Sequence, residues 1–166
     1  MYNIPEINTT PLITELRQIS VMVNEPGDED ILESSSEELH IIFIRLDELA
    51  ALDVDEKSTD AILKCPNFDP LMNTISRFRF LYNLKLEIEQ AKSLLESPDP
   101  WKTLRYFTFY PNYLQLARTE YTGSGLKPGD YVLFLGSGPL PLSLIVLCHE
   151  YGLFGIGIEQ DGKRAD

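Results

Sequence analysis

Residues 133–142, Leu-Phe-Leu-Gly-Ser-Gly-Pro-Leu-Pro-Leu, constrain the fold of this chain more than any other segment. An apolar run leads into a turn that contains Gly136 and Gly138, and helix-forming residues follow. Because glycine lacks a Cβ atom, a ligand can approach the backbone of such a turn closely, and the first N–H groups of a following helix can bind an anion. Pro139 costs no hydrogen bond at a helix start. The segment predicts a strand, a cofactor loop and a helix.

A purely structural turn is the alternative, because Pro141 stands where the dinucleotide fingerprint has its third glycine. The flanking residues favour the cofactor loop. Residues 130–135 and 154–158 contain β-forming side chains, and residues 139–151 predict a helix that ends at Gly152, a typical C-terminal cap. Glu159 follows the second predicted strand, where an acid can accept hydrogen bonds from ribose hydroxyls; a surface glutamate at a strand end is the alternative.

The residues before this unit predict helices. Apolar residues recur at helical spacing over 11–23 and 36–49, and the longest helix is expected over about 70–97, before Pro98. Residues 53–60 predict a polar break. We therefore expect an α-helical N-terminal domain over residues 1–122, a linker over 123–129, and over 130–166 the first β-α-β unit of an α/β Rossmann-like domain.

Glu87 has an unusual place on the longest predicted helix. Five apolar residues form a stripe on this helix: Phe80, Leu84, Ile88, Ala91 and Leu95. Glu87 projects at the edge of the stripe, away from the face expected to be in water. A carboxylate in this place lies either at the rim of a helical layer or inside a pocket.

Aromatic residues are concentrated between Trp101 and Tyr113, and core packing explains most of them. Pro111 is expected to hold Tyr110 out of helical geometry and to open the next helix as its first residue. Because Tyr110 and Tyr113 flank this proline just before the predicted cofactor unit, both are candidates for a pocket wall with a polar tip.

Charge and cysteine content exclude several classes of protein. The chain has 14 Lys and Arg against 26 Asp and Glu, a formal net charge of −12, which disfavours nucleic acid and membrane surfaces as partners. Cys65 and Cys148 fit reduced thiols of a cytoplasmic protein, and no signal peptide is expected. No cluster of His and Cys with ligand spacing is present in the sequence, so no bound metal is expected.

Three blocks together, residues 85–89, 100–114 and 135–142, resemble the nicotianamine synthase family, with the archaeal members most similar. The resemblance covers the chain from about Phe78 onward. It implies a fold of the S-adenosylmethionine-dependent methyltransferase type. It also implies transfer of a 3-amino-3-carboxypropyl group from S-adenosylmethionine to an amine, with release of 5′-methylthioadenosine, in the biosynthesis of a nicotianamine-type metal chelator. The acceptor would be glutamate or an aminocarboxypropyl amine.

The resemblance also implies roles for particular residues. Glu87 would act at the amine acceptor as ligand or general base, and Tyr113 would position the attacking amine. Residues implied to hold the donor are Gly136, Ser137, Gly138, Pro139 and Tyr110, with Glu159 on its ribose.

A Rossmann-like domain needs about five further strands after Glu159, so we expect this chain to be the front half of such an enzyme. Its open sheet edge would favour aggregation or a second polypeptide that completes the sheet, and the chain alone would be inactive. Two other hypotheses stay open: a methyltransferase with a helical extension, and a non-enzymatic helical interaction module.

Overall fold

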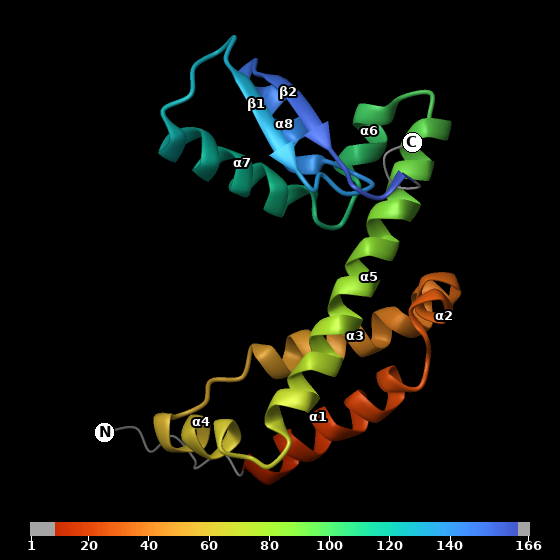
Figure 1. The fold of residues 1–166 in the computed structure, drawn as a ribbon, viewed down its shortest axis with the longest axis vertical. Coiled ribbons are helices and arrows are strands. Elements are labelled where there is room, and N and C mark those ends of the chain that lie inside the picture. Colours follow the sequence, from red (N-terminus) through yellow and green to blue (C-terminus); the bar gives the residue numbers. More distant parts are fainter. Residues whose placement is uncertain (1–8, 163–166) are drawn as a thin grey trace. The chain divides into compact units, whose positions relative to one another are not determined.

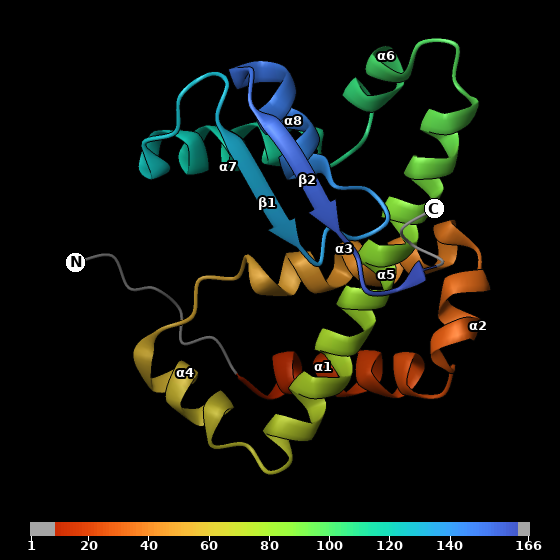
Figure 2. The same cartoon turned by 45° about the horizontal axis from the view of Figure 1, so that its top comes forward.

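The computed structural model describes residues 9–162. By compactness the chain divides into two units, Met1–Asn83 and Leu84–Asp166, whose elements are labelled in Figure 1 and seen from a second direction in Figure 2. The predicted linker at 123–129 lies inside the second unit, so the domain division based on it stays a prediction. Residues 1–8 and 163–166, the ends of the two predicted domains, lie outside the described residues.

The first unit is helical, as predicted. Its helices are α1 (Thr9–Asn24), α2 (Asp28–Glu33), α3 (Ser36–Ala50), α4 (Glu56–Leu63) and the first half of α5 (Phe68–Glu96). The predicted polar break over 53–60 is too long, because the Asp55 carboxylate accepts a hydrogen bond from the Ser58 N–H at 2.7 Å and starts α4 at Glu56. Helix α2 was not expected. It begins after Gly27, whose N–H donates to the Asp30 carboxylate at 2.9 Å.

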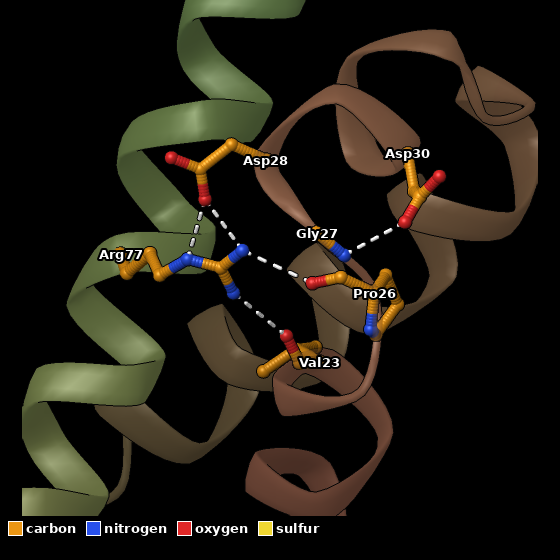
Figure 3. Close-up of polar contacts among 6 residues, drawn as sticks. All are labelled: Val23, Pro26, Gly27, Asp28, Asp30 and Arg77. Carbon is orange, nitrogen blue, oxygen red and sulfur yellow. Dashed lines mark hydrogen bonds and ion pairs between the residues drawn. The ribbon is translucent and has the colours of Figure 1, made fainter.

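Arg77 of α5 connects three segments of the first unit, as Figure 3 shows. Its guanidinium donates to Asp28 Oδ1 from Nε at 2.7 Å, to the Val23 carbonyl at 3.2 Å and to the Pro26 carbonyl at 3.0 Å. Val23 lies in the last turn of α1 and Pro26 lies just after the helix, where carbonyl groups have no partner within the helix. A planar guanidinium can serve all of them at once, so Arg77 holds the turn between α1 and α2 against α5.

The apolar stripe predicted for α5 is wrong at both ends, since Phe80 is 59% exposed and Leu95 is 82% exposed. The first half of α5 buries another face, formed by Leu71, Ile75, Phe78, Leu81 and Tyr82. The second half contributes Leu86, Ala91 and Leu94 to the core of the second unit. Because the first and second halves of α5 bury different sets of residues, a single stripe cannot describe the whole helix.

The second unit contains the predicted β-α-β arrangement. Its elements are α6 (Pro100–Arg105), α7 (Tyr110–Ser124), β1 (Tyr131–Leu135), α8 (Leu142–Tyr151) and β2 (Phe154–Ile158). The two strands pair in parallel, with Tyr131 opposite Phe154 and Leu135 opposite Ile158. A helical region followed by the start of an α/β Rossmann-like domain is thus the observed fold class.

Two helix starts differ from the expectation. Helix α8 begins at Leu142 and not at Pro139, because Pro141 disfavours helical geometry for the residue before it. Helix α7 begins at Tyr110, with Pro111 in its first turn, so Tyr110 is helical. The Tyr110 side chain is buried, and its N–H donates to the Phe107 carbonyl at 2.9 Å, which together outweigh the preference that Pro111 imposes.

Close packing of α8 on β2 depends on two glycines of β2. A Cβ atom built on Gly155 would lie 2.6 Å from Leu144 Cδ1 and 2.7 Å from Cys148 Sγ, both on α8. A Cβ atom on Gly157 would lie 3.0 Å from Ser137 Oγ. These contacts leave no room for a side chain, so Gly155 allows the close packing of α8 on β2 and Gly157 allows the close packing of Ser137 on β2.

Candidate active site

Glu87 and Tyr113 form a hydrogen-bonded pair between α5 and α7. The Tyr113 hydroxyl donates to Glu87 Oε1 at 3.1 Å, although the residues are 26 positions apart. Burial raises the pKa of Glu87, and the hydrogen bond from Tyr113 partly opposes that rise. Burial and the neighbouring Glu87 raise the pKa of Tyr113 to about 12. At neutral pH the phenol therefore stays protonated, and only Glu87 of the two can accept a proton.

The glycine turn is attached to the end of β2. The N–H groups of Gly136 and Ser137 both donate to the Ile158 carbonyl, at 2.7 and 3.1 Å. Gly136 and Gly138 each have a φ of +71°, a left-handed conformation that other residues rarely adopt. The turn therefore needs glycine at both positions, as the sequence pattern indicated.

Glu159 is held beside this turn. Gly138 N–H donates to Glu159 Oε2 at 2.9 Å, and Asp161 N–H donates to Oε1 at 3.0 Å. A Cβ atom built on Gly138 would lie 3.4 Å from Glu87 Oε2. The structure thus brings four predicted site residues, Glu87, Tyr113, Gly138 and Glu159, into one continuous cluster.

The other predicted site residues lie around this cluster in different ways. Ser137 turns its side chain over Gly157 of β2, and Pro139 is half-buried in the loop before α8. Because α8 begins four residues after Gly138, the first N–H groups of this helix do not directly follow the glycine turn. The sequence analysis did not predict the close approach of Ser137 and Gly157, although the alternating glycines of β2 could have indicated it.

Tyr110 belongs to the buried cluster of the second unit, together with Leu104, Phe107 and Leu147. Burial raises the pKa of its hydroxyl, Glu150 adds to that rise, and Arg105 opposes it. Glu150 lies near the C-terminal end of α8, whereas the glycine turn precedes the other end of that helix. A cofactor role for Tyr110 stays a prediction.

Among residues 9–162, no three His, Cys, Asp or Glu side chains gather in a way that could hold a metal ion. Within the same range, no helix has the length and apolar character to cross a membrane.

A helical region, a parallel β-α-β unit, a glycine turn after β1 and an acid after β2 agree with an S-adenosylmethionine-dependent methyltransferase-like fold. The sequence model of the family described as "Nicotianamine synthase protein" matches residues 8–156. The chain belongs to the nicotianamine synthase family.

Relatives with known names agree with this assignment. Nicotianamine synthase 1 of Hordeum vulgare is 31% identical over 116 residues, which are 60% of this chain and 35% of the relative. Probable nicotianamine synthase 7 of the same plant is 29% identical over 132 residues, 68% of this chain and 40% of the relative. The chain therefore spans well under half the length of these relatives.

Solved structures of a protein called MtNAS share the fold. MtNAS in complex with MTA and tNA superposes with a TM-score of 0.79 at 29% identity, covering 96% of this chain and 59% of that chain. A glutamate-to-glutamine variant of MtNAS in complex with S-adenosylmethionine superposes with a TM-score of 0.75 at 29% identity, covering 92% of this chain and 56% of that chain.

Proposed function

We propose that this chain forms the acceptor side and the donor loop of a nicotianamine synthase-type transferase. Such an enzyme moves a 3-amino-3-carboxypropyl group from S-adenosylmethionine to an amine, releases 5′-methylthioadenosine and builds a nicotianamine-type metal chelator. The observation that carries the proposal is the cluster of Glu87, Tyr113, Gly138 and Glu159. The MtNAS complexes with S-adenosylmethionine and with MTA support it.

Glu87 would be the general base for the acceptor. An ammonium has to lose a proton before its nitrogen can attack carbon, and a carboxylate with a raised pKa is suited to take that proton near neutral pH. The nitrogen lone pair then forms the new C–N bond, and the electrons of the broken C–S bond stay on sulfur. Tyr113, protonated, would orient the Glu87 carboxylate through its hydrogen bond and would stand beside the attacking amine.

The donor would be held by the glycine turn and by Glu159. Two backbone N–H groups orient the Glu159 carboxylate, and carboxylate oxygens are acceptors suited to ribose hydroxyls. The sulfonium of the donor supplies a strong leaving group. The residues around it therefore mainly have to align the amine with one of its three carbons.

The proposal also covers the acceptor and the location of the protein. The acceptor would be an amino acid such as glutamate, or an aminocarboxypropyl amine. The two free thiols, Cys65 and Cys148, and the strongly acidic composition suit a cytoplasmic protein.

Substitution of Glu87 tests this proposal. In a chain supplied with the completing strands, Glu87→Gln is expected to slow transfer by about 10²- to 10⁴-fold, the usual contribution of a general base. Binding of S-adenosylmethionine, measured by calorimetry, should change little because Gly138 and Glu159 are intact. Unchanged turnover would remove Glu87 from the chemistry.

The spent donor separates the remaining hypotheses. Release of 5′-methylthioadenosine is expected, whereas S-adenosylhomocysteine would identify an ordinary methyltransferase. If neither S-adenosylmethionine nor 5′-methylthioadenosine gives binding heat with the completed protein, a non-enzymatic helical module is the better description.

A further inference from the structure

A pocket of about 550 Å³ lies beside α6 in the second unit. It is lined by Asp99, Trp101, Lys102, Arg105 and Tyr106, and we call it the α6 pocket. None of these residues belongs to the cluster that forms the candidate active site. Its volume is within the range of pockets that hold small molecules. The helix itself is anchored, because Leu104 between the lining residues is part of the buried core of the second unit.

Two aromatic side chains form one part of the α6 pocket. Trp101 stacks on His149 of α8, with ring centroids 3.8 Å apart and planes inclined by 26°. The imidazole covers one face of the indole and fixes its orientation, while Trp101 stays 37% exposed. Tyr106 is 79% exposed. Exposed aromatic rings in a pocket are suited to stack on a planar ring of a ligand.

Two cations form another part of the pocket. Lys102 and Arg105 are three residues apart on α6, so they are neighbours on its surface. Within the described range, residues 9–162, neither side chain forms an ion pair, whereas Arg45, Lys64 and Arg79 each pair with an acid. The chain as a whole has a formal net charge of −12. Two adjacent cations without an acid partner give this pocket a local positive potential that attracts an anion.

Asp99 is the one acid of the pocket, and it has a structural task. Its carboxylate accepts a hydrogen bond from the Lys102 N–H at 3.0 Å and caps the start of α6. Lys102 and Arg105 lie in the last turn, where cations generally favour the helix dipole. The dipole explains the cations alone, but it does not explain two exposed aromatic rings in the same pocket.

We propose that the α6 pocket binds a small anion that has a planar aromatic ring. The ring would stack on Trp101 and Tyr106, and its phosphate or carboxylate group would accept hydrogen bonds from Lys102 and Arg105. The guanidinium of Arg105 offers two parallel N–H donors for such a group. A nucleoside monophosphate and an aromatic carboxylate share this chemistry. The inference goes beyond the proposed function, because it concerns residues outside the candidate active site.

Titration with two probes, adenosine 5′-monophosphate and benzoate, tests the proposal. Trp101 is the single tryptophan of the 166 residues, so its fluorescence reports directly on the pocket. We expect saturable quenching by at least one probe, with a Kd of about 1 mM or lower. The probe that binds more tightly identifies the phosphate or the carboxylate as the preferred anion. Adenosine and inorganic phosphate, which lack the anion and the ring respectively, should bind at least about tenfold more weakly than the nucleotide.

Variants of the lining residues show which side chains hold the probe. Arg105→Ala should weaken binding by about 10- to 100-fold, the usual effect of losing a hydrogen bond to a charged group. Lys102→Ala should act in the same direction. Lys127→Ala is the matched control, because it removes the same charge at an exposed position outside α6 and should bind normally. Circular dichroism checks that each variant is folded.

Three outcomes would overturn the α6 pocket: no saturable binding of either probe, equal weakening by Arg105→Ala and Lys127→Ala, or binding of adenosine or phosphate as tight as that of the nucleotide. Displacement of the nucleotide by 5′-methylthioadenosine would place it at the proposed donor site and would also overturn the pocket. Nucleotide binding that 5′-methylthioadenosine leaves unchanged supports the pocket, whether or not the protein transfers an aminocarboxypropyl group.

Discussion

At the scale of single residues, the pairing of Glu87 with Tyr113 determines which group can act as a base. The family resemblance implied Glu87 as ligand or general base and Tyr113 as the residue that positions the attacking amine. In the structure, burial and the neighbouring carboxylate raise the pKa of Tyr113 to about 12, so the phenol is a hydrogen-bond donor at neutral pH. Burial raises the pKa of Glu87 from its ordinary value of 4.5, which makes Glu87 a stronger base than an ordinary carboxylate.

Tyr113→Phe should raise the pKa of Glu87 further, because the hydrogen bond from Tyr113 is what opposes the effect of burial. Carbon-13 NMR titration of the Glu87 carboxyl measures this directly. In the completed enzyme the acid limb of the rate profile should move to higher pH. Tyr106→Phe, at a hydroxyl that is well exposed, serves as control. A titration that Tyr113→Phe does not move would show that the bond has no energetic effect.

Glu87→Gln should stabilise the chain at neutral pH. The folded pKa of Glu87 is raised above 4.5, so stability from this group is present below about pH 4.5 and is lost as the pH rises through the folded pKa. Glutamine has no charge to desolvate. We expect a higher Tm for the variant at pH 7 and no difference near pH 4. The same gain for Glu96→Gln, an exposed position of α5, would point to general charge repulsion instead.

At the scale of secondary-structure elements, the contact of α8 with β2 depends on the absence of a side chain. A Cβ atom on Gly155 would stand 2.6 Å from Leu144, closer than real Cβ atoms approach other atoms. The helix would have to move away from the strand, and Ser137 and the glycine turn are held by that same strand. The spacing of these elements therefore also determines the shape of the donor loop.

Gly155→Ala should lower the free energy of unfolding by about 1–3 kcal/mol, the usual cost of overpacking. Gly123→Ala is the matched control in α7, because nothing lies within 4 Å of the added methyl group. It should raise the stability by roughly 0.5–1 kcal/mol through helix propensity. Denaturant unfolding of both variants checks the pair, and equal effects would refute the packing argument.

At the scale of the whole molecule, the chain consists of two compact units that share α5, and the candidate site lies in the second. The first unit has its own anchor, Arg77, which donates to Asp28 and to the carbonyls of Val23 and Pro26. Stability of the first unit and binding at the site therefore depend on different residues.

Arg77→Ala should lower the free energy of unfolding by about 1–3 kcal/mol, because it leaves carbonyl groups and a carboxylate without their charged donor. Arg79→Ala removes an exposed pair with Asp47 and should cost less than about 1 kcal/mol. Amide hydrogen exchange would locate the loss in α1 and α2. Affinity for S-adenosylmethionine should be the same in both variants, and a decrease for Arg77→Ala alone would show that the units are coupled.

The sequence by itself determined the β-α-β unit and both glycines of its turn, because these features depend on local periodicity and on backbone conformations that only glycine adopts readily. It also determined the family, through three blocks of residues. It misjudged the stripe of α5, because that stripe depends on which neighbours cover the helix. It also misjudged the start of α8, because Pro141 delays that start from Pro139 to Leu142.

Only the tertiary structure decided that Glu87 contacts Tyr113 and that Glu159 binds Gly138 N–H. These contacts join residues 26 and 21 positions apart. Helical periodicity cannot specify them, since it indicates which face of one element is apolar but not which element will cover that face. The basicity of Glu87 depends on the residues that bury it, because burial is what raises its pKa.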